Sequence, residues 1–239
     1  MTTIDALAER GSIPRVLSIA GTDPSGGAGT AADIKSITAA GGYAMAVVTS
    51  LVAQNTQGVR AIHTPPINFL AQQLAALSDD VTIDAVKTGM LGTVEIVDAV
   101  AAFLDEHRPP VVVVDPVMVA TSGDRLLAPD AEAAVREFCR RATVITPNIP
   151  ELAVLCQSDP AMTPKQAVEQ ARRWASETGV AVVVKTGHLD SQRVDNVWVT
   201  PEGTMYTAPA ARVETTNTHG TGCSLSSALA TRLGAGIAP

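Results

Sequence analysis

Runs of β-branched and small apolar residues alternate with helix-forming segments along most of this 239-residue chain. Such runs are typical of strands in a parallel sheet, where helices bury both faces. Alternation of strand and helix favours a mostly parallel central sheet with helices on both sides. We therefore predict a three-layer α/β/α fold. The predicted strands cover residues 16–20, 44–53, 83–87, 111–115, 144–146 and 180–185.

Two of the predicted helices have clear start signals. Thr93 can cap a helix that follows the third strand, and Thr163 begins a second one. In that second helix Pro164 takes the first position and Gln166 completes a capping box. Gly179 should end this helix immediately before the last predicted strand.

Charge and cysteine content exclude several classes of protein. The net charge is −7, from 17 basic and 24 acidic residues, and no basic run suggests a nucleic-acid or anionic membrane surface. Three widely spaced cysteines without a C-x-x-C pair suggest neither a disulfide framework nor a zinc site. Residues 1–15 lack the apolar run of a signal peptide, and longer apolar stretches are broken before about 20 residues. We expect a cytoplasmic protein with an N-terminal, flexible extension over residues 1–15 and one domain over residues 16–239.

The first glycine-rich loop follows a strand and opens a helix. Its Gly27-x-Gly29-x-x-Ala32 pattern suggests a dinucleotide site, but that site needs an acid about 20 residues later. No acid stands between Asp33 and Asp79, so the NAD interpretation is weak. A P-loop lysine is also missing. A plain tight turn is the alternative, but Asp33, one turn into the helix and semi-buried among apolar neighbours, favours a polar ligand.

A second glycine turn, over residues 217–223, leads into a run of small helix-compatible residues. Its backbone N–H groups and the helix N-terminus form a concave anion site, suited to a phosphoryl group in transfer. Cys223 lies at the helix start, where thiol pKa values fall. From position alone, a small buried residue that fills space is the better interpretation of Cys223.

Almost every predicted strand ends in polar or glycine residues, and ligands of such sheets bind outside the carboxyl ends of the strands. Six motifs stand in order: SIAGTDPSGGAG (18–29), VAQNT (52–56), KTGML (87–91), DPVM (115–118), TPNIPE (146–151) and HGTGC (219–223). With these motifs the chain resembles the hydroxymethylpyrimidine/phosphomethylpyrimidine kinases of the ribokinase-like superfamily.

The resemblance implies an enzyme of thiamine biosynthesis that uses ATP and Mg²⁺. Its substrate would be 4-amino-5-hydroxymethyl-2-methylpyrimidine, and members commonly phosphorylate the monophosphate again. A homodimer is also implied. Gln54 matches the residue that recognises the pyrimidine, and one primary amide can pair with an aminopyrimidine edge. The implied substrate-binding residues are Gly21, Asp33, Val52, Gln54 and Met90.

By the same resemblance, Cys223 is the catalytic base that deprotonates the hydroxymethyl group, which reverses the interpretation from position. Asp115 and Glu151 would hold Mg²⁺, a cation that prefers oxygen ligands. Ordinary capping is the alternative for these acids, and a solvated charge is the alternative for Lys185. The implied catalytic residues are Cys223, Gly220, Gly222 and Lys185, and the implied nucleotide-binding residues are Asn148, Glu151, Lys185, Gly187 and Thr216.

Two departures and two rival functions remain. Thr186 stands where relatives usually have glycine, so its side chain would narrow the nucleotide loop or point to water. The chain ends at Pro239, where relatives continue for another helix or two, so we expect the C-terminal helices of the family to be shortened or absent. The rivals are a pyridoxal kinase of the same superfamily and a catalytically silent pyrimidine-binding protein.

Overall fold

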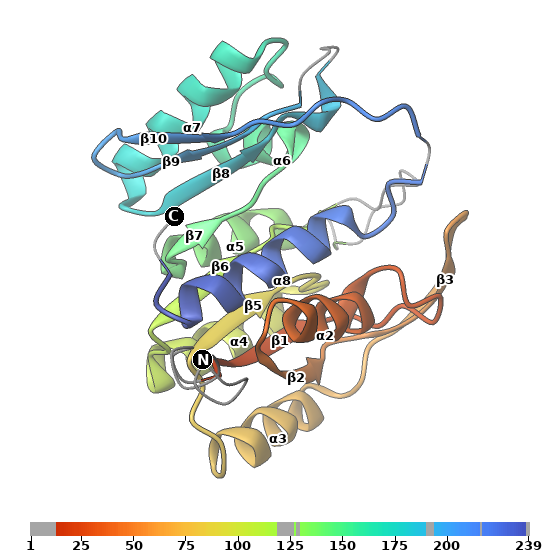
Figure 1. Ribbon diagram of the computed structural model, residues 1–239. Helices are drawn as coiled ribbons and strands as arrows, with labels where there is room; N and C mark the ends of the chain where they lie inside the picture. The colour runs from red at the N-terminus through yellow and green to blue at the C-terminus, as the bar shows by residue number, and fades with distance from the viewer. Residues whose placement is uncertain (1–12, 119–126, 128–129, 190–193, 216, 238–239) are drawn as a thin grey trace, which may run out of the picture.

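The computed structural model describes residues 13–118, 127, 130–189, 194–215 and 217–237, and an eight-stranded sheet runs through it (Figure 1). The order of strands is β10-β9-β8-β7-β6-β5-β1-β2. All neighbouring strands from β2 to β8 in this order pair in parallel. Strand β9 pairs antiparallel with β8, and β10 pairs antiparallel with β9. Their bounds are β1 (Arg15–Ala20), β2 (Tyr43–Val48), β5 (Ala85–Thr88), β6 (Val111–Val114), β7 (Val144–Ile145), β8 (Ala181–Lys185), β9 (Asn196–Val199) and β10 (Met205–Ala208).

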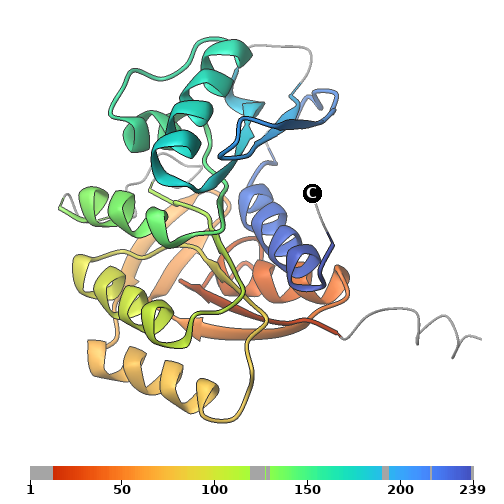
Figure 2. The same ribbon diagram turned by 90° about the vertical axis from the view of Figure 1, so that its left-hand side faces the viewer.

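Helices cover both faces of the sheet, as Figure 2 shows. On one face α2 (Gly29–Ala39) packs beside α8 (Thr221–Gly234), and on the other the remaining helices follow one another. Those are α3 (Ile67–Ser78), α4 (Val94–His107), α5 (Ala131–Phe138), α6 (Ile149–Cys156) and α7 (Pro164–Thr178), and two short 3₁₀ turns are η1 (Cys139–Arg141) and η2 (Thr186–His188). No helix in the described part of the chain is long and apolar enough to cross a membrane.

Alternation along each strand divides the side chains between two cores. Leu17 and Val86 belong to the larger core, under helices α3 to α7. Val16 and Ala85 point the other way, into the smaller core under α2 and α8. Because the side-chain period of a strand is two, Lys87 follows Ala85 onto the α2 and α8 face.

The predicted strands are confirmed to within two residues, with one error. Residues 44–53 were predicted as one strand, but the chain leaves the sheet at Thr49 and Ser50. There the Ser50 carbonyl accepts a hydrogen bond from the Thr22 N–H at 2.9 Å. Thr49 and Ser50 therefore interrupt the predicted strand. The chain then forms β3 (Leu51–Asn55), which pairs with β4 (Gly58–His63) in a separate two-stranded sheet that projects from the body (Figure 1).

Strands β4, β9 and β10 were not predicted from the sequence. They are short, and most of their side chains are exposed or half-buried, so they lack the continuous apolar runs of the parallel strands. The helix starts were predicted correctly. The Thr93 hydroxyl accepts from the Ile96 N–H, and Thr163 and Gln166 form the expected capping box.

The predicted division at residue 15 falls at the first strand, because β1 begins at Arg15. Residues 1–12 lie outside the described residues. The N-terminal extension and the single domain over residues 16–239 therefore stay predictions.

Candidate active site

A fully buried ion pair joins β5 to α2. The Lys87 ammonium lies 2.8 and 2.9 Å from the two carboxylate oxygens of Asp33, and both side chains have no exposed surface. Ser18 on β1 and Ser227 on α8 donate to the same carboxylate at 2.6 and 2.7 Å. The prediction that Asp33 is semi-buried was therefore wrong, because four donated hydrogen bonds allow the carboxylate to be fully enclosed.

A second ion pair lies at the carboxyl ends of β6 and β8. The Lys185 ammonium is 3.0 Å from Asp115, whose carboxylate also accepts from Thr146 at 3.0 Å and Ser226 at 3.3 Å. Burial would raise the pKa of Asp115, but Lys185 and Lys87 hold that pKa below its usual value. A Cβ atom at Gly222 would come within 3.2 Å of the Lys185 ammonium, so the first turn of α8 meets this pair directly.

Glu151 and Asn148 form the capping box of α6. The Asn148 N–H donates to Glu151, and the Glu151 N–H donates to Asn148, both at 2.9 Å. Burial raises the pKa of Glu151 to about 7, although Lys185 opposes the shift. The capping role that we weighed against ligand binding is therefore real, and Glu151 lies beside the second ion pair with a pKa that leaves it divided between its two forms near pH 7.

The two glycine-rich loops touch through their backbones. Gly220 has φ +76°, and a Cβ atom there would lie 1.7 Å from the carbonyl oxygen of Gly27. Gly29 has φ +55°, and a Cβ atom there would lie 2.3 Å from the carbonyl oxygen of Gly21. Glycine is therefore required at both positions, for conformation and for space.

Asp23 ties these loops together with its side chain. Its carboxylate accepts from Ser25 and Ala28 in its own loop, and it lies 2.7 Å from His219 in the other. Burial would raise the pKa of Asp23, but these hydrogen bonds lower it overall. The loops thus hold each other in position at the start of α8, and His219 has a polar role within them.

Cys223 lies in the first turn of α8, between the two ion pairs. The backbone N–H of Gly29, at the start of α2, favours the thiolate of Cys223. Burial raises the pKa of the Cys223 thiol, Asp115 and Asp33 raise it further, and Lys87 opposes them. The prediction that a helix start lowers this pKa was wrong, because loss of water outweighs the helix terminus here.

Three predicted substrate residues meet beside these loops. A Cβ atom at Gly21 would touch the Met90 methyl at 2.7 Å and Val52 at 3.5 Å, so the three form one small wall. Gln54 is half-buried on the same hairpin as Val52, and its amide lies 3.5 Å from the Thr22 carbonyl. Gly29 links this wall to Cys223, because its backbone packs on the Gly21 carbonyl and its N–H favours the Cys223 thiolate.

Among the predicted nucleotide residues, Asn148 pairs with Lys185 in a parallel β-bridge and with Glu151 in the capping box, so these three lie together. Gly187 lies in η2, where nothing would touch a Cβ atom within 4 Å. Thr216 lies outside the described residues. Thr186 neither narrows the loop nor points to water, because it is buried and donates to the Asp195 carbonyl at 2.6 Å.

The carboxylates of Asp115 and Glu151 fit magnesium only in part. Within the described residues, no three His, Cys, Asp or Glu side chains gather as a metal cage. Two buried carboxylates are nevertheless the usual protein share for Mg²⁺, which keeps waters and takes further oxygens from substrate phosphates.

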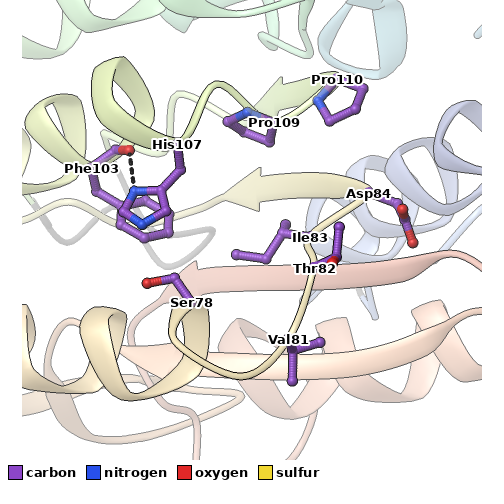
Figure 3. Close-up of a pocket in the computed structure, with 9 residues that line it drawn as sticks. All are labelled: Ser78, Val81, Thr82, Ile83, Asp84, Phe103, His107, Pro109 and Pro110. Carbon is purple, nitrogen blue, oxygen red and sulfur yellow. Dashed lines mark hydrogen bonds between the residues drawn. The ribbon is translucent and has the colours of Figure 1, made fainter.

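A groove of about 300 Å³ lies at the opposite end of the strands (Figure 3). Its His107 ring stacks on Phe103 and bonds to the Phe103 carbonyl, and its Asp84 pairs with Arg15. The ionisable side chains of this groove are thus already paired. The groove does not adjoin any of the predicted site residues.

Sequence reasoning missed four residues that organise the site: Lys87, Asp23, Ser226 and Ser227. Lys87 belonged to a quoted motif but received no role. The available signal was a lysine at the end of an apolar strand together with an aspartate in a helix expected to cover the sheet. Because buried charges are paired, these two residues could have been predicted to form an ion pair.

Comparisons with known proteins agree with this geometry. The family model described as "Phosphomethylpyrimidine kinase" matches residues 23–239. The chain is 58% identical over 225 residues to the thiamine biosynthesis multifunctional protein ThiED of Corynebacterium glutamicum. The match covers 94% of this chain and 30% of that relative. It is 47% identical over 216 residues to the hydroxymethylpyrimidine/phosphomethylpyrimidine kinase of Escherichia coli, covering 90% of this chain and 80% of that one.

Among solved structures, the ADP complex of Bacillus subtilis pyridoxal kinase superposes with a TM-score of 0.86. The two chains are 34% identical, and the match covers 95% of this chain and 86% of that one. This likeness confirms the predicted ribokinase-like α/β/α fold. The chain spans about a third of the length of the Corynebacterium relative.

The contact between the glycine loops gives a testable prediction. Gly220→Ala should destabilise the protein by more than about 2 kcal/mol and abolish turnover, since it adds a clash with Gly27 to an unfavourable φ. Gly203→Ala is the matched control, because Gly203 also has positive φ but faces open space. Urea unfolding and a kinase assay would measure both variants. Equal unfolding free energies would contradict the importance of the contact.

Proposed function

The chain belongs to the phosphomethylpyrimidine kinase family, and from that premise we propose that it transfers the γ-phosphate of ATP to 4-amino-5-hydroxymethyl-2-methylpyrimidine. The resulting monophosphate is the proposed second substrate. One observation carries the proposal. A free thiol, a helix N-terminus and a buried lysine–aspartate pair converge at the carboxyl edge of the sheet, beside an apolar wall. A protein that only binds a pyrimidine has no use for that convergence.

The proposed chemistry assigns one proton and one phosphoryl group. The Cys223 thiolate takes the proton of the substrate hydroxyl, whose oxygen then bonds to the γ-phosphorus while the bond to the β–γ bridging oxygen breaks. ADP leaves with that oxygen. Lys185 and the N–H groups at the start of α8 stabilise the negative charge on the transferring group. Asn148, Gly187 and Thr216 are the proposed further contacts with the nucleotide.

Magnesium has a place in this proposal beside Asp115 and Glu151. When bound, Mg²⁺ would neutralise charge on the phosphate oxygens. Glu151 would ionise next to the cation, since its pKa of about 7 leaves it close to balance between its two forms.

The pyrimidine is proposed to lie against the wall of Gly21, Val52 and Met90. Met90 offers a polarisable contact to a flat ring, and Gln54 offers an amide to its polar edge. The oxygens of Asp33 are occupied by protein donors. We therefore propose that Asp33 serves the substrate site by holding neighbouring segments in place, without binding the pyrimidine directly. Homodimerisation is part of the proposal on the strength of the resemblance alone, and a cytoplasmic location is part of it on the strength of the cysteine spacing and the apolar pattern.

The decisive test is mass spectrometry of the products formed from Mg-ATP and either hydroxymethylpyrimidine or pyridoxal. We expect the pyrimidine monophosphate, followed by the diphosphate. Pyridoxal is the right competitor because the superposed Bacillus protein is a pyridoxal kinase. Formation of pyridoxal phosphate alone would show that the chain is a pyridoxal kinase and contradict the proposed substrate. Pyrimidine binding by calorimetry without any product would favour the silent binding protein.

Replacement of the proposed base should separate chemistry from binding. Cys223→Ala should lower kcat by about 10²–10⁴-fold and leave the Kd of the pyrimidine nearly unchanged. In the unaltered enzyme kcat/KM should rise with pH through the alkaline range, because the thiolate is the active form and its pKa is raised. Cys156→Ala, at a half-buried free thiol, is the control. Near-normal turnover by Cys223→Ala would remove this residue from the mechanism.

Replacement of the proposed ring-reading amide should act on binding instead. Gln54→Ala should raise the KM for the pyrimidine, with little effect on kcat, because it removes contacts made equally in ground and transition states. Gln57→Ala, an exposed position on the same hairpin, is the control. An unchanged KM would show that the ring is recognised elsewhere.

A further inference from the structure

Two series of hydrogen-bonded side chains, each a serine, an aspartate and a lysine, anchor helix α8, which carries Cys223. Ser226 reaches Asp115, which pairs with Lys185, and Ser227 reaches Asp33, which pairs with Lys87. The two serines stand three and four residues after Cys223, so they lie on the same side of α8 one turn further along. The position of the thiol is therefore set by both carboxylates.

The two lysines differ in their surroundings. Lys185 keeps 17% of its side chain exposed and faces the predicted phosphate site. Lys87 has no exposed surface, and a Cβ atom at Gly89 would already come within 3.1 Å of its ammonium. A substrate has no path to the Lys87 ammonium, so any effect of this lysine on the reaction must pass through a neighbour.

That neighbour is Cys223. The charged groups that act on the thiol are Lys87 from β5, Asp33 from α2, Asp115 after β6 and Lys185 from β8, together with the Gly29 N–H. Lys87 is the strongest of them, and it favours the thiolate. Its charge is retained despite burial, because Asp33 holds its pKa above the usual value.

We propose that Lys87 is a positioning residue for the reaction, which fixes α8 through Asp33 and Ser227 and stabilises the thiolate of Cys223. This inference rests on the proposed function, in which Cys223 accepts the proton. It gives the buried ion pair a part in the chemistry as well as in the fold.

The test is a double variant, Asp33→Asn with Lys87→Met, which removes both buried charges together and leaves neither one unpaired. Lys87 acts on Cys223 more strongly than Asp33 does, so the net effect should disfavour the thiolate. At a fixed pH below the midpoint we expect iodoacetamide to alkylate Cys223 about tenfold more slowly, because a higher thiol pKa leaves less of the reactive thiolate. The alkaline limb of kcat/KM should move to higher pH.

The chain supplies its own controls. Cys156, followed in the same digest by mass spectrometry, should react at an unchanged rate, because the charged groups that act on it do not include Lys87. Lys165→Met, at an exposed position in the first turn of α7, should change neither cysteine. Circular dichroism and thermal unfolding would establish that each variant is folded.

A folded double variant with unchanged Cys223 alkylation would overturn the proposal. So would slower alkylation without any shift of the pH–rate profile. If the unaltered chain phosphorylates nothing, the proposed function fails, and the alkylation comparison alone then decides whether Lys87 controls the thiol.

If the double variant does not fold, Ser227→Ala tests the same connection. It removes the hydrogen bond from α8 to Asp33 and leaves the ion pair in place. We expect kcat to fall about tenfold with KM changed by less than about twofold. An unchanged kcat in this variant would overturn the positioning role.

Discussion

The buried pair between Lys87 and Asp33 is the interaction on which the rest of the site depends. It joins β5 to α2, and the carboxylate extends the connection to β1 through Ser18 and to α8 through Ser227. Loss of one partner of a buried pair costs about 3–5 kcal/mol, because the other charge is left in a medium that cannot solvate it. The four elements must therefore assemble in one arrangement, and that arrangement determines where the first turn of α8 lies.

The second pair, between Lys185 and Asp115, uses the same chemistry at the edge of the sheet instead of its interior. Its residues still face α8, because strand alternation carries Val113 and Asp115, or Val183 and Lys185, onto one face. Partial exposure leaves the Lys185 ammonium available to a ligand. The interior pair thus holds the helix, and the peripheral pair is the one that we propose to meet the phosphate.

Much of this arrangement could be predicted from the sequence, and the exceptions have physical reasons. Continuous apolar runs identified the parallel strands, and cap residues identified α4 and α7, because both signals are local. The break at Thr49 and Ser50 depends on a hydrogen bond from Thr22, about thirty residues earlier, which no local pattern contains. The raised pKa of Cys223 likewise depends on enclosure by distant segments. The motifs contain the residues that the structure brings together at the carboxyl ends of the strands, but the partners of Asp33 could be found only in the structure.

The hairpin of β3 and β4 has a consequence for the evolution of such enzymes. It carries Val52 and Gln54, yet it forms a sheet of its own, apart from the eight strands that hold the lysines and the acids. In the proposed function, substitutions on the hairpin would therefore alter which ring is accepted without disturbing phosphoryl transfer. Such modularity would let one scaffold serve different ring substrates, and the close superposition on a pyridoxal kinase is in accord with it.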